Sequence, residues 1–512
     1  MLRSMLRNKI FRWGTKKGYG QEVQIWVCFH HTMRSLTSWI RHNGIFVIGW
    51  IAFGLLALKL FFPLYRFSAP LAYDVGIYRY LFVQYGGVWP PFVMPDLLPW
   101  AKEHPLGLFL FSTALLKGGI PVDWLVGWMW NAFALVLASV LAWIMGQREG
   151  RTIGVCTLIM ALLSQAYFDG FAAMYWKTYA ALLWMVLAFY GFERRRFFLG
   201  VLFSALVLIT HHQTGLLLGL VLGSFCLLHI RSLMSKMRVS ALFICVLAAL
   251  FITIVYLPVA EEALLRHLPT LLSGWHAPDG SFPPPLFYVR ITGILLLLGI
   301  GGWVWSLRRE RGTLWQLTVF WSAVFVLLRL MFYRRFFLQL DFFLLPFAAM
   351  FFVMLWKRWK EPGLRLCLVV LLLVQGTASA YGAWGSAPML SPETFAAAQG
   401  LSAFIPREAT VIALEDRSAL LLRGWLPYNS VGGPGLFDLS WSREEWEKFL
   451  LGSHGERQEL LRRLKGSVYL FVSPFFRSYY GEYAAKFLKD ECFEETESGF
   501  LVKVSEECLN DD

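Results

Sequence analysis

Long apolar runs are the feature of this sequence that most limits how it can fold. They recur from residue 44 to residue 384 and are continuous, without a period of two. A helix crosses a bilayer with roughly 20 apolar residues, whereas the strands of a membrane barrel alternate. The chain is also 57% hydrophobic and only 16% charged, so a soluble globule would expose large apolar patches. The sequence therefore predicts a polytopic α-helical membrane protein and excludes a soluble enzyme.

The apolar runs predict about eleven transmembrane helices. They are 44–62, 122–146, 152–168, 176–192, 197–210, 215–230, 239–258, 290–307, 313–332, 336–356 and 364–384. The segment 105–116 is too short to cross and is predicted to lie at the outer interface. The segment 197–210 is also short, so we expect its end to line a cavity.

The basic residues set the predicted orientation. They gather in the first 43 residues and in the connectors 147–151, 193–196, 231–238, 308–312 and 357–365. With eleven spans, all of these fall on one side, and the positive-inside rule makes that side the cytoplasm. We therefore expect a multi-pass protein of the cell membrane with a cytoplasmic N-terminus and an extracytoplasmic C-terminus. No nucleic-acid-binding motif accompanies the net charge of +13.

Three domains follow from this topology. Residues 1–43 form a basic amphipathic segment on the inner leaflet, and residues 44–384 form the transmembrane domain with a long first outer loop, 63–121. Residues 385–512 form an extracytoplasmic α/β domain. Its predicted helices are 392–404, 443–451, 456–464 and 480–488, and its predicted strands are 409–414, 468–472 and 500–504.

Two further outer features are less specific. The loop 259–289 is rich in Pro and His and can fold over a cavity as a lid; its charged and His residues are Glu261, Glu262, Arg266, His267 and His276. In the C-terminal domain, Cys492 and Cys508 either form a disulfide, as an oxidising compartment permits, or remain two free thiols.

Asp74 is the first candidate for chemistry. It lies just beyond the first span, in the aromatic stretch that begins at Tyr73. A carboxylate in weakly solvated surroundings gains basicity and can accept a proton from a hydroxyl. The alternative is a structural role as the N-cap of a helix over 75–84.

Asp169 is the second candidate, and the topology places it on the same face as Asp74. Two carboxylates at one outer cavity can share base and orienting roles, or hold a divalent cation. The alternative is an Asp-Gly turn at a helix end.

His211 and His212 are adjacent at a membrane boundary, where lipid exposure is costly, so at least one of them should face a polar cavity. A neutral His can hydrogen-bond a phosphate or a sugar hydroxyl. Because adjacent residues do not share a helix face, the pair is a poor two-His metal site. The alternative is that one caps the helix and the other faces interfacial water.

A tight hairpin, Phe332–Phe337, is predicted to place Arg334 and Arg335 at the outer end of two spans. Guanidinium groups bind phosphate bidentately, so these residues can grip the phosphate of a lipid. Alternatively, Arg329 or Arg335 pairs with Asp341. Lys177 is a lesser phosphate candidate that can equally snorkel.

The first outer loop resembles that of the GT-C superfamily of membrane glycosyltransferases, which use polyprenyl-phosphate-linked sugars. The resemblance is carried by Asp74-Val75-Gly76-Ile77-Tyr78, Gly86-Gly87 and His104-Pro105-Leu106. At these places the family often shows an acid, an aromatic residue, glycine and a Pro-led helix. The order of parts over nearly the whole chain is also similar: a cytoplasmic N-terminus, a long first outer loop, about eleven spans and a C-terminal outer domain.

This resemblance implies roles for the candidates. Asp74 matches the catalytic acid of the first loop, and Asp169 matches a second-loop acid found in several branches. Arg334 or Arg335 matches the basic residue that contacts the donor phosphate, and His211 or His212 stands where other members have a polar residue in the cavity. The first loop has a single Asp rather than a paired-acid motif, and no WWD-like motif follows the last span. These departures put metal dependence in doubt and argue against an oligosaccharyltransferase.

The function so implied is inverting, hexosyltransferase-like glycosyl transfer from a polyprenyl-phosphate sugar to a hydroxyl of a glycan, lipid or protein. Asp74 acts as base, and no cofactor is expected apart from an unproven divalent cation. Alternatives are a transporter or flippase of lipid-linked sugars, a surface-polysaccharide polymerase or ligase, and a non-catalytic scaffold. Inverted repeats or charged residues deep in a span would favour the transporter, and the sequence analysis identifies neither.

Overall fold

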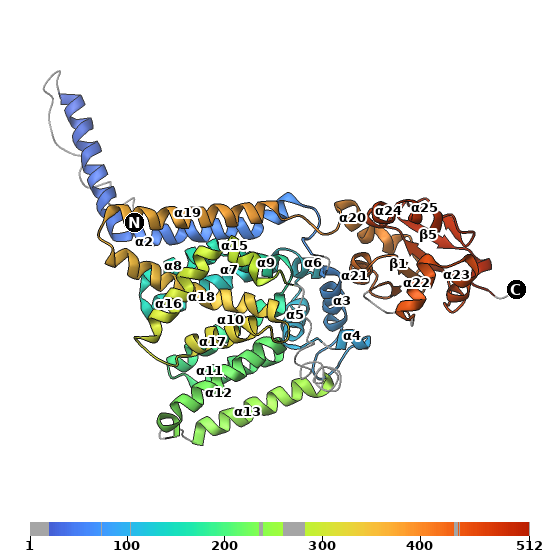
Figure 1. Ribbon diagram of the computed structural model, residues 1–512, viewed down its shortest axis with the longest axis horizontal. Helices are drawn as coiled ribbons and strands as arrows, with labels where there is room; N and C mark the ends of the chain where they lie inside the picture. The colour runs from blue at the N-terminus through green and yellow to red at the C-terminus, as the bar shows by residue number, and fades with distance from the viewer. Residues whose placement is uncertain are drawn as a thin grey trace. The chain divides into compact units, whose positions relative to one another are not determined.

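The computed structural model describes residues 20–72, 74–102, 104–234, 239–259, 282–434, 439 and 441–510 (Figure 1). Residues 52–512 form one compact unit, distinct from residues 1–51. Most of the predicted lid and its five charged and His residues lie outside the described residues, as does the start of the basic N-terminal segment.

The part before the C-terminal domain is helical. Its helices are α2 (Gly20–Arg66), α3 (Val75–Gly86), α4 (Pro99–Lys102), α5 (Gly107–Lys117), α6 (Val122–Val126), α7 (Trp128–Glu149), α8 (Arg151–Leu163), α9 (Gln165–Ala172), α10 (Trp176–Glu193), α11 (Phe197–Thr210), α12 (His212–Met234), α13 (Val239–Tyr256), α15 (Pro285–Ile291), α16 (Gly293–Leu307), α17 (Leu314–Leu327), α18 (Tyr333–Arg358) and α19 (Pro362–Gly385). A short 3₁₀ turn covers Leu257–Val259. Each of the eleven predicted spans overlaps one or two of these helices.

Within the described ranges, five helices are long and apolar enough to cross a membrane. They are Asn43–Arg66, Trp128–Glu149, His212–His229, Tyr333–Arg358 and Pro362–Gly385. Two helix pairs pass the same test together but are bent, α8–α9 by 59° and α15–α16 by 98°, which gives up to seven spans. Shorter apolar helices include α11, α17 and the 244–256 part of α13. The chain is therefore a multi-pass helical membrane protein, and the count of eleven stays a prediction.

Helix α18 forms the centre of the bundle. It packs against α16, α17 and α8, while α10 packs on α11 and α7 on α8. At Gly302 of α16 a Cβ atom would collide with the backbone of Phe347, so only glycine permits the close approach of α16 to α18. Helices α2 and α19 run side by side (Figure 1), and Phe62 stacks on Trp384 with ring centroids 4.8 Å apart.

The C-terminal domain is built on a five-stranded sheet with the order β2-β1-β3-β5-β4. The strands are β1 (Thr410–Ala413), β2 (Ser430–Gly432), β3 (Val468–Phe471), β4 (Phe493–Glu495) and β5 (Leu501–Val504). Strand β1 is parallel to β2 and β3, whereas β5 is antiparallel to β3 and β4. The helices are α20 (Pro392–Gly400), α21 (Asp416–Trp425), α22 (Arg443–Leu451), α23 (His454–Leu461), α24 (Pro474–Tyr480) and α25 (Glu482–Phe487), with 3₁₀ turns at Leu401–Ala403 and Glu506–Cys508.

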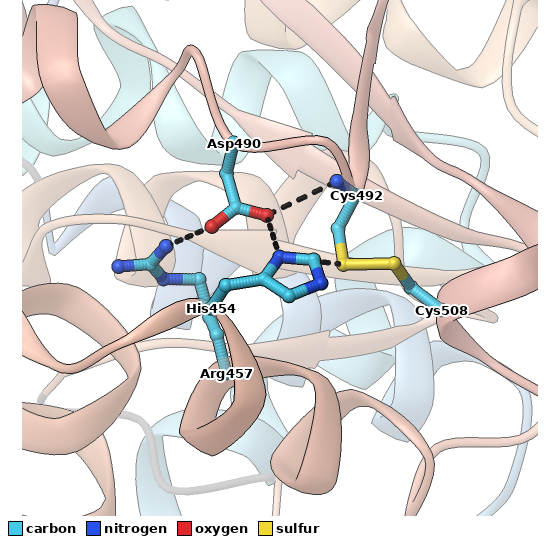
Figure 2. The surroundings of a disulfide bond; sticks show 5 residues. All are labelled: His454, Arg457, Asp490, Cys492 and Cys508. Atoms are coloured by element: carbon cyan, nitrogen blue, oxygen red, sulfur yellow. Dashed lines mark hydrogen bonds and ion pairs between the residues drawn. A yellow bond between two sulfur atoms is a disulfide. The ribbon is translucent and has the colours of Figure 1, made fainter.

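A disulfide joins the last two cysteines of this domain (Figure 2). Cys492 and Cys508 are bonded, which decides between the two alternatives left open by their spacing. The carboxylate of Asp490 accepts the backbone N–H of Cys492 at 3.0 Å, pairs with His454 at 2.8 Å and forms an ion pair with Arg457. Asp490 therefore links α23 to Cys492, and the disulfide links Cys492 to Cys508.

Helix α3 of the first outer loop packs on α21 of the C-terminal domain. Arg79 fixes this contact: it donates to Gly424 O at 2.6 Å, pairs with Asp123 at 3.1 Å and covers the Trp425 ring at 5.1 Å. Because Asp74 immediately precedes α3, the C-terminal domain holds the element that carries the first candidate residue.

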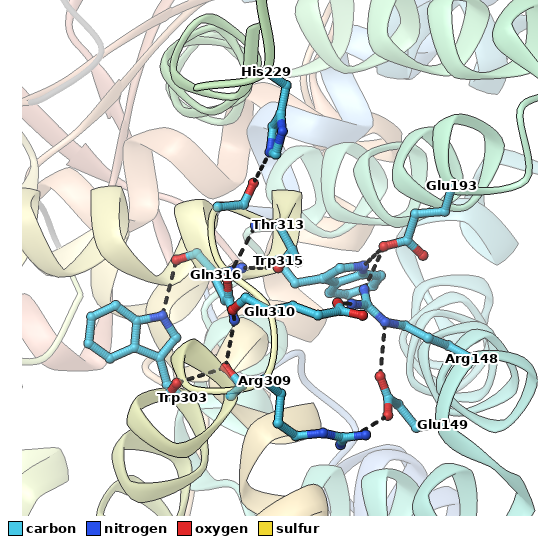
Figure 3. Close-up of polar contacts among 12 residues, drawn as sticks. Arg148, Glu149, Glu193, His229, Trp303, Arg309, Glu310, Thr313, Trp315 and Gln316 are labelled. Carbon is cyan, nitrogen blue, oxygen red and sulfur yellow. Dashed lines mark hydrogen bonds and ion pairs between the residues drawn. The ribbon is translucent and has the colours of Figure 1, made fainter. Parts of the chain in front are cut away.

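The opposite ends of the bundle helices meet in a charged cluster (Figure 3). Arg148 at the end of α7 pairs with Glu149, Glu193 and Glu310 at 3.1, 2.5 and 3.4 Å. Glu193 also accepts the indole N–H of Trp315 at 2.9 Å. These ion pairs border a cavity of about 250 Å³ and join the ends of α7, α10 and α16.

Candidate functional site

Asp74 lies at the start of α3 as a partly buried residue and makes no side-chain capping hydrogen bond. Asp74 is therefore the N-cap residue of α3, as the alternative predicted, but its side chain does not cap the helix. Burial raises the pKa of Asp74, and the positive charges of Lys177 and Arg335 oppose that rise. A carboxylate in this setting is more basic than an exposed one and lies within electrostatic range of two cations.

Lys177 enters the same site from the start of α10. Its Nζ atom lies 3.2 Å from Nδ1 of His104 and 5.9 Å from the centre of the Tyr78 ring. The hydroxyl of Tyr78 stays protonated, because burial raises its pKa further above the ordinary value. The structure therefore places Lys177 against the loop 63–121 that carries His104 and Tyr78.

Arg334 and Arg335 make contacts with different residues. Helix α17 ends at Leu327 and α18 begins at Tyr333, so the turn lies before the predicted hairpin, and both arginines belong to the first turn of α18. The backbone between the helices is left-handed at Arg329 and Phe332, which tightens this turn. Arg335 lies over the Tyr175 ring at 5.4 Å and within electrostatic range of Asp74. The contacts identified for Arg334 are instead with the side chain of Tyr333.

His211 lies between α11 and α12. Its Nδ1 atom is 3.4 Å from the backbone N of Thr214 and 2.8 Å from the hydroxyl of that residue, so His211 caps α12 as one alternative proposed. Its ring also lies within electrostatic range of Lys177 and Arg335. His212 packs its ring near Tyr256, with centroids 5.7 Å apart.

Asp169 belongs to a second polar group. It lies within α9 rather than in a turn at a helix end. Its Oδ1 atom accepts from Gln165 at 2.7 Å and its Oδ2 atom accepts from Tyr288 at 2.8 Å. Lys59 and Asp341 are its charged neighbours. The structure therefore gathers Asp74, Lys177, Arg335 and His211 in one group and Asp169 in another.

Sequence reasoning missed part of both groups. The sequence gives His104 only as part of a motif and Tyr78 only as an aromatic residue. Lys59 and Asp341 are charged residues within span-capable helices, which the search for charges deep in a span does not single out. Asp341 accepts from Ser164 at 2.6 Å, and Lys59 is the basic neighbour that the structure gives it in place of an arginine. A lysine inside the first apolar run was the available signal.

A divalent cation needs several oxygen or nitrogen ligands together. In the described part of the chain, one group of three His, Cys, Asp or Glu residues has metal-ligand spacing: His454, Cys492 and Cys508. The sulfur atoms of both cysteines are used in the disulfide, so this group is not a metal centre in the oxidised protein.

Comparison with known proteins rests on structure. No protein-family model and no curated protein matches the sequence. The oligosaccharyltransferase of Archaeoglobus fulgidus in its apo form is similar, with a TM-score of 0.59 and 10% identity, over 88% of this chain and 72% of that one. ArnT from Cupriavidus metallidurans bound to undecaprenyl phosphate is similar with a TM-score of 0.55 and 11% identity, over 93% of this chain and 100% of that one.

Most of this chain aligns with each of the two structures, and with ArnT the match covers the whole of the other chain. At 10–11% identity the likeness concerns the fold and not the individual residues. The chain therefore shares the fold of these two proteins, as the GT-C resemblance in its sequence implied.

Proposed function

We propose that the protein is an inverting glycosyltransferase that moves a sugar from a polyprenyl-phosphate donor to an acceptor hydroxyl on the extracytoplasmic face of the cell membrane. The observation that carries this proposal is the grouping of the partly buried carboxylate of Asp74 with the cations of Lys177 and Arg335. The fold supports it, since a similar structure, ArnT, is bound to undecaprenyl phosphate.

In the proposed reaction the acceptor oxygen attacks the anomeric carbon, and Asp74 takes the proton of that hydroxyl. The bond between the anomeric carbon and the phosphate oxygen breaks, and its electron pair stays on the departing polyprenyl phosphate. Arg335 and Lys177 stabilise the negative charge that develops there, with His211 close by. Arg334 is the alternative to Arg335 in this role, and His212 is the alternative to His211.

The orientation proposed for the chain in the membrane agrees with this chemistry. A polyprenyl donor reaches the site laterally through the membrane, which suits a compartment without nucleotide sugars. The C-terminal domain then covers the same outer face through α21 and α3. The acceptor is a hydroxyl of a glycan, a lipid or a protein.

Asp74→Asn tests the base. The amide is nearly isosteric but cannot accept a proton, so transfer should fall at least about 100-fold, while binding of polyprenyl phosphate is kept. Asp96→Asn is the matched control, because Asp96 lies exposed in the same outer loop. Loss of donor binding together with turnover in Asp74→Asn, or normal turnover in it, contradicts this role.

Arg335→Gln tests the phosphate contact, with Arg334→Gln as the neighbouring control. We expect weaker binding of undecaprenyl phosphate in the first variant and near-normal binding in the second. Equal effects would contradict the assignment of Arg335 over Arg334.

One observation favours a second function, transport of lipid-linked sugars. Charged residues within spans and two broken helices are features that transporters share. Reconstituted vesicles separate the two functions. A glycosyl product formed from added lipid-linked sugar supports the transferase, whereas movement of the lipid across the bilayer without any product supports the transporter.

A further inference from the structure

The two broken helices meet at a single side chain. The bend between α8 and α9 lies at Ser164, and the bend between α15 and α16 lies at Thr292. Gln375 of α19 is 1% exposed, and its Nε2 atom donates to Leu163 O at 3.4 Å and to Ile291 O at 3.1 Å. These are the last residues of α8 and α15, whose carbonyl groups have lost their helical partners.

Lys59 of α2 donates hydrogen bonds to the carbonyl groups at the bend between α8 and α9. Its Nζ atom donates to Leu162 O at 3.0 Å, to Ser164 O at 2.8 Å and to the hydroxyl of Ser379 at 2.6 Å. An ammonium group has three donors, and all three are used. Two of the acceptors are carbonyls at the C-terminal end of α8, which is also the negative end of the helix dipole.

Two carboxylates surround this ammonium group. Asp341 of α18 is 1% exposed and accepts from the hydroxyl of Ser164 at 2.6 Å. Asp169 is held by Gln165 and Tyr288. Both lie within electrostatic range of Lys59. A buried carboxylate in a membrane protein needs such a partner, since an isolated charge there is costly.

We infer that the break between α8 and α9, together with Ser379 of α19, forms an internal site for a monovalent cation, and that the ammonium group of Lys59 is its built-in occupant. Carbonyl, hydroxyl and carboxylate oxygens are the ligands that hard cations prefer. Unwound carbonyls of discontinuous helices coordinate sodium in transporters. Here the cation is covalently attached to α2, so it neutralises the carboxylates without being released. Lys59 thereby acts as a positioning residue for the α8–α9 bend that carries Asp169.

This inference does not rest on the proposed glycosyl transfer, and its test needs no substrate. Lys59→Ala removes the tethered cation and leaves its oxygen ligands. The purified full-length variant is heated in detergent with sodium, potassium or choline chloride at equal ionic strength. We expect its unfolding temperature to be several degrees below that of the wild type in choline, and to rise saturably with sodium or potassium.

Three controls make the outcome specific. The wild type and Lys357→Ala, which alters an exposed lysine at the end of α18, should unfold at the same temperature in all three salts. Lys59→Ala/Asp341→Asn, which also removes a carboxylate charge, should lose the response to small cations. An unfolding temperature of Lys59→Ala that is identical in the three salts overturns the inference.

If Lys59→Ala does not fold, Lys59→Met/Asp341→Leu decides the matter. This double variant removes one charge of each sign, so it should fold better than either single variant if Lys59 is the counterion of Asp341. A double variant that is no more stable than the worse single variant overturns the inference.

Discussion

The contact between α3 and α21 leads to a prediction that tests how the C-terminal domain is held. Gly424 of α21 faces Gly76 of α3, and a Cβ atom on Gly424 would lie 2.6 Å from both the Cα and the carbonyl oxygen of Gly76. Ordinary contacts of a Cβ atom begin near 3.4 Å. Gly424→Ala therefore forces the two helices apart, because the atoms that it meets are backbone and cannot rotate away.

The size of the effect follows from two opposing terms. Alanine in place of glycine inside a helix contributes about 1 kcal/mol. Overpacking costs about 1–3 kcal/mol, and a clash with backbone belongs at the upper end. We expect a net loss of about 2 kcal/mol from the docked state, which shifts the equilibrium between docked and undocked domain about 30-fold.

Hydrogen exchange of α3 and α21, together with limited proteolysis of the linker 386–391, measures this equilibrium. Gly424→Ala should exchange and be cleaved faster than the wild type. Gly455→Ala is the control, since this glycine lies in a helix of the same domain with nothing within 4 Å of the added Cβ atom. Wild-type protection in Gly424→Ala would refute the backbone-to-backbone packing of the two helices.

Three further predictions concern the outer face. Replacing Cys492 and Cys508 by serine opens a loop with a sequence separation of 16 and should destabilise the domain by about 3 kcal/mol; an unchanged denaturant midpoint would contradict this. Although burial opposes it, the backbone N–H of Cys492 and two basic side chains lower the pKa of Asp490. The ionised Asp490 side chain thus stabilises the folded domain fully above its ordinary pKa of about 4. This stabilisation is lost as the pH falls below that value. Asp490→Asn should abolish this acid-dependent loss in a series of thermal melts. Finally, a base must be deprotonated, so the raised pKa of Asp74 should move the acidic limb of the rate–pH profile above 3.8, the ordinary value; a limb at or below that value would argue against Asp74 as the base.

Much of the candidate site could be predicted because topology alone brings its members to one side. Asp74 follows the first span, Lys177 begins another, and Arg335 and His211 stand at the ends of two more. Two predicted spans separate successive basic connectors, and one span separates each connector from the next loop that carries a site residue. This count assigns these residues to one face before any packing is known. The choice between Arg334 and Arg335 could not be made, since it depends on the exact rotation of α18 at its first turn.

The C-terminal domain shows a different limit. Its α/β character and strands β1, β3 and β5 follow from apolar runs of four or five residues. Strands β2 and β4 have only three residues each, and α24 has seven. Elements so short carry no measurable periodicity, and the sheet decides their structure. The packing of α21 on α3 could not be predicted either, because it depends on Gly76 and Gly424, which lie 348 positions apart in the sequence.

The polar core around Lys59 shows why a charge within a span is ambiguous in sequence. Lys59 is a single basic residue in an apolar run, and a charge of this kind is as typical of a transport pathway as of a structural pin. Its acceptors lie more than 100 positions away in Leu162 and Ser164 and 320 positions away in Ser379. Only the bend at Ser164 exposes the carbonyls that bind it. What separates the two roles is whether the donors are already satisfied: a cation with three oxygen ligands has no coordination left for a travelling substrate. By that criterion, the buried charge that favours a transporter at first sight instead explains how the broken helix α8–α9 is held in place.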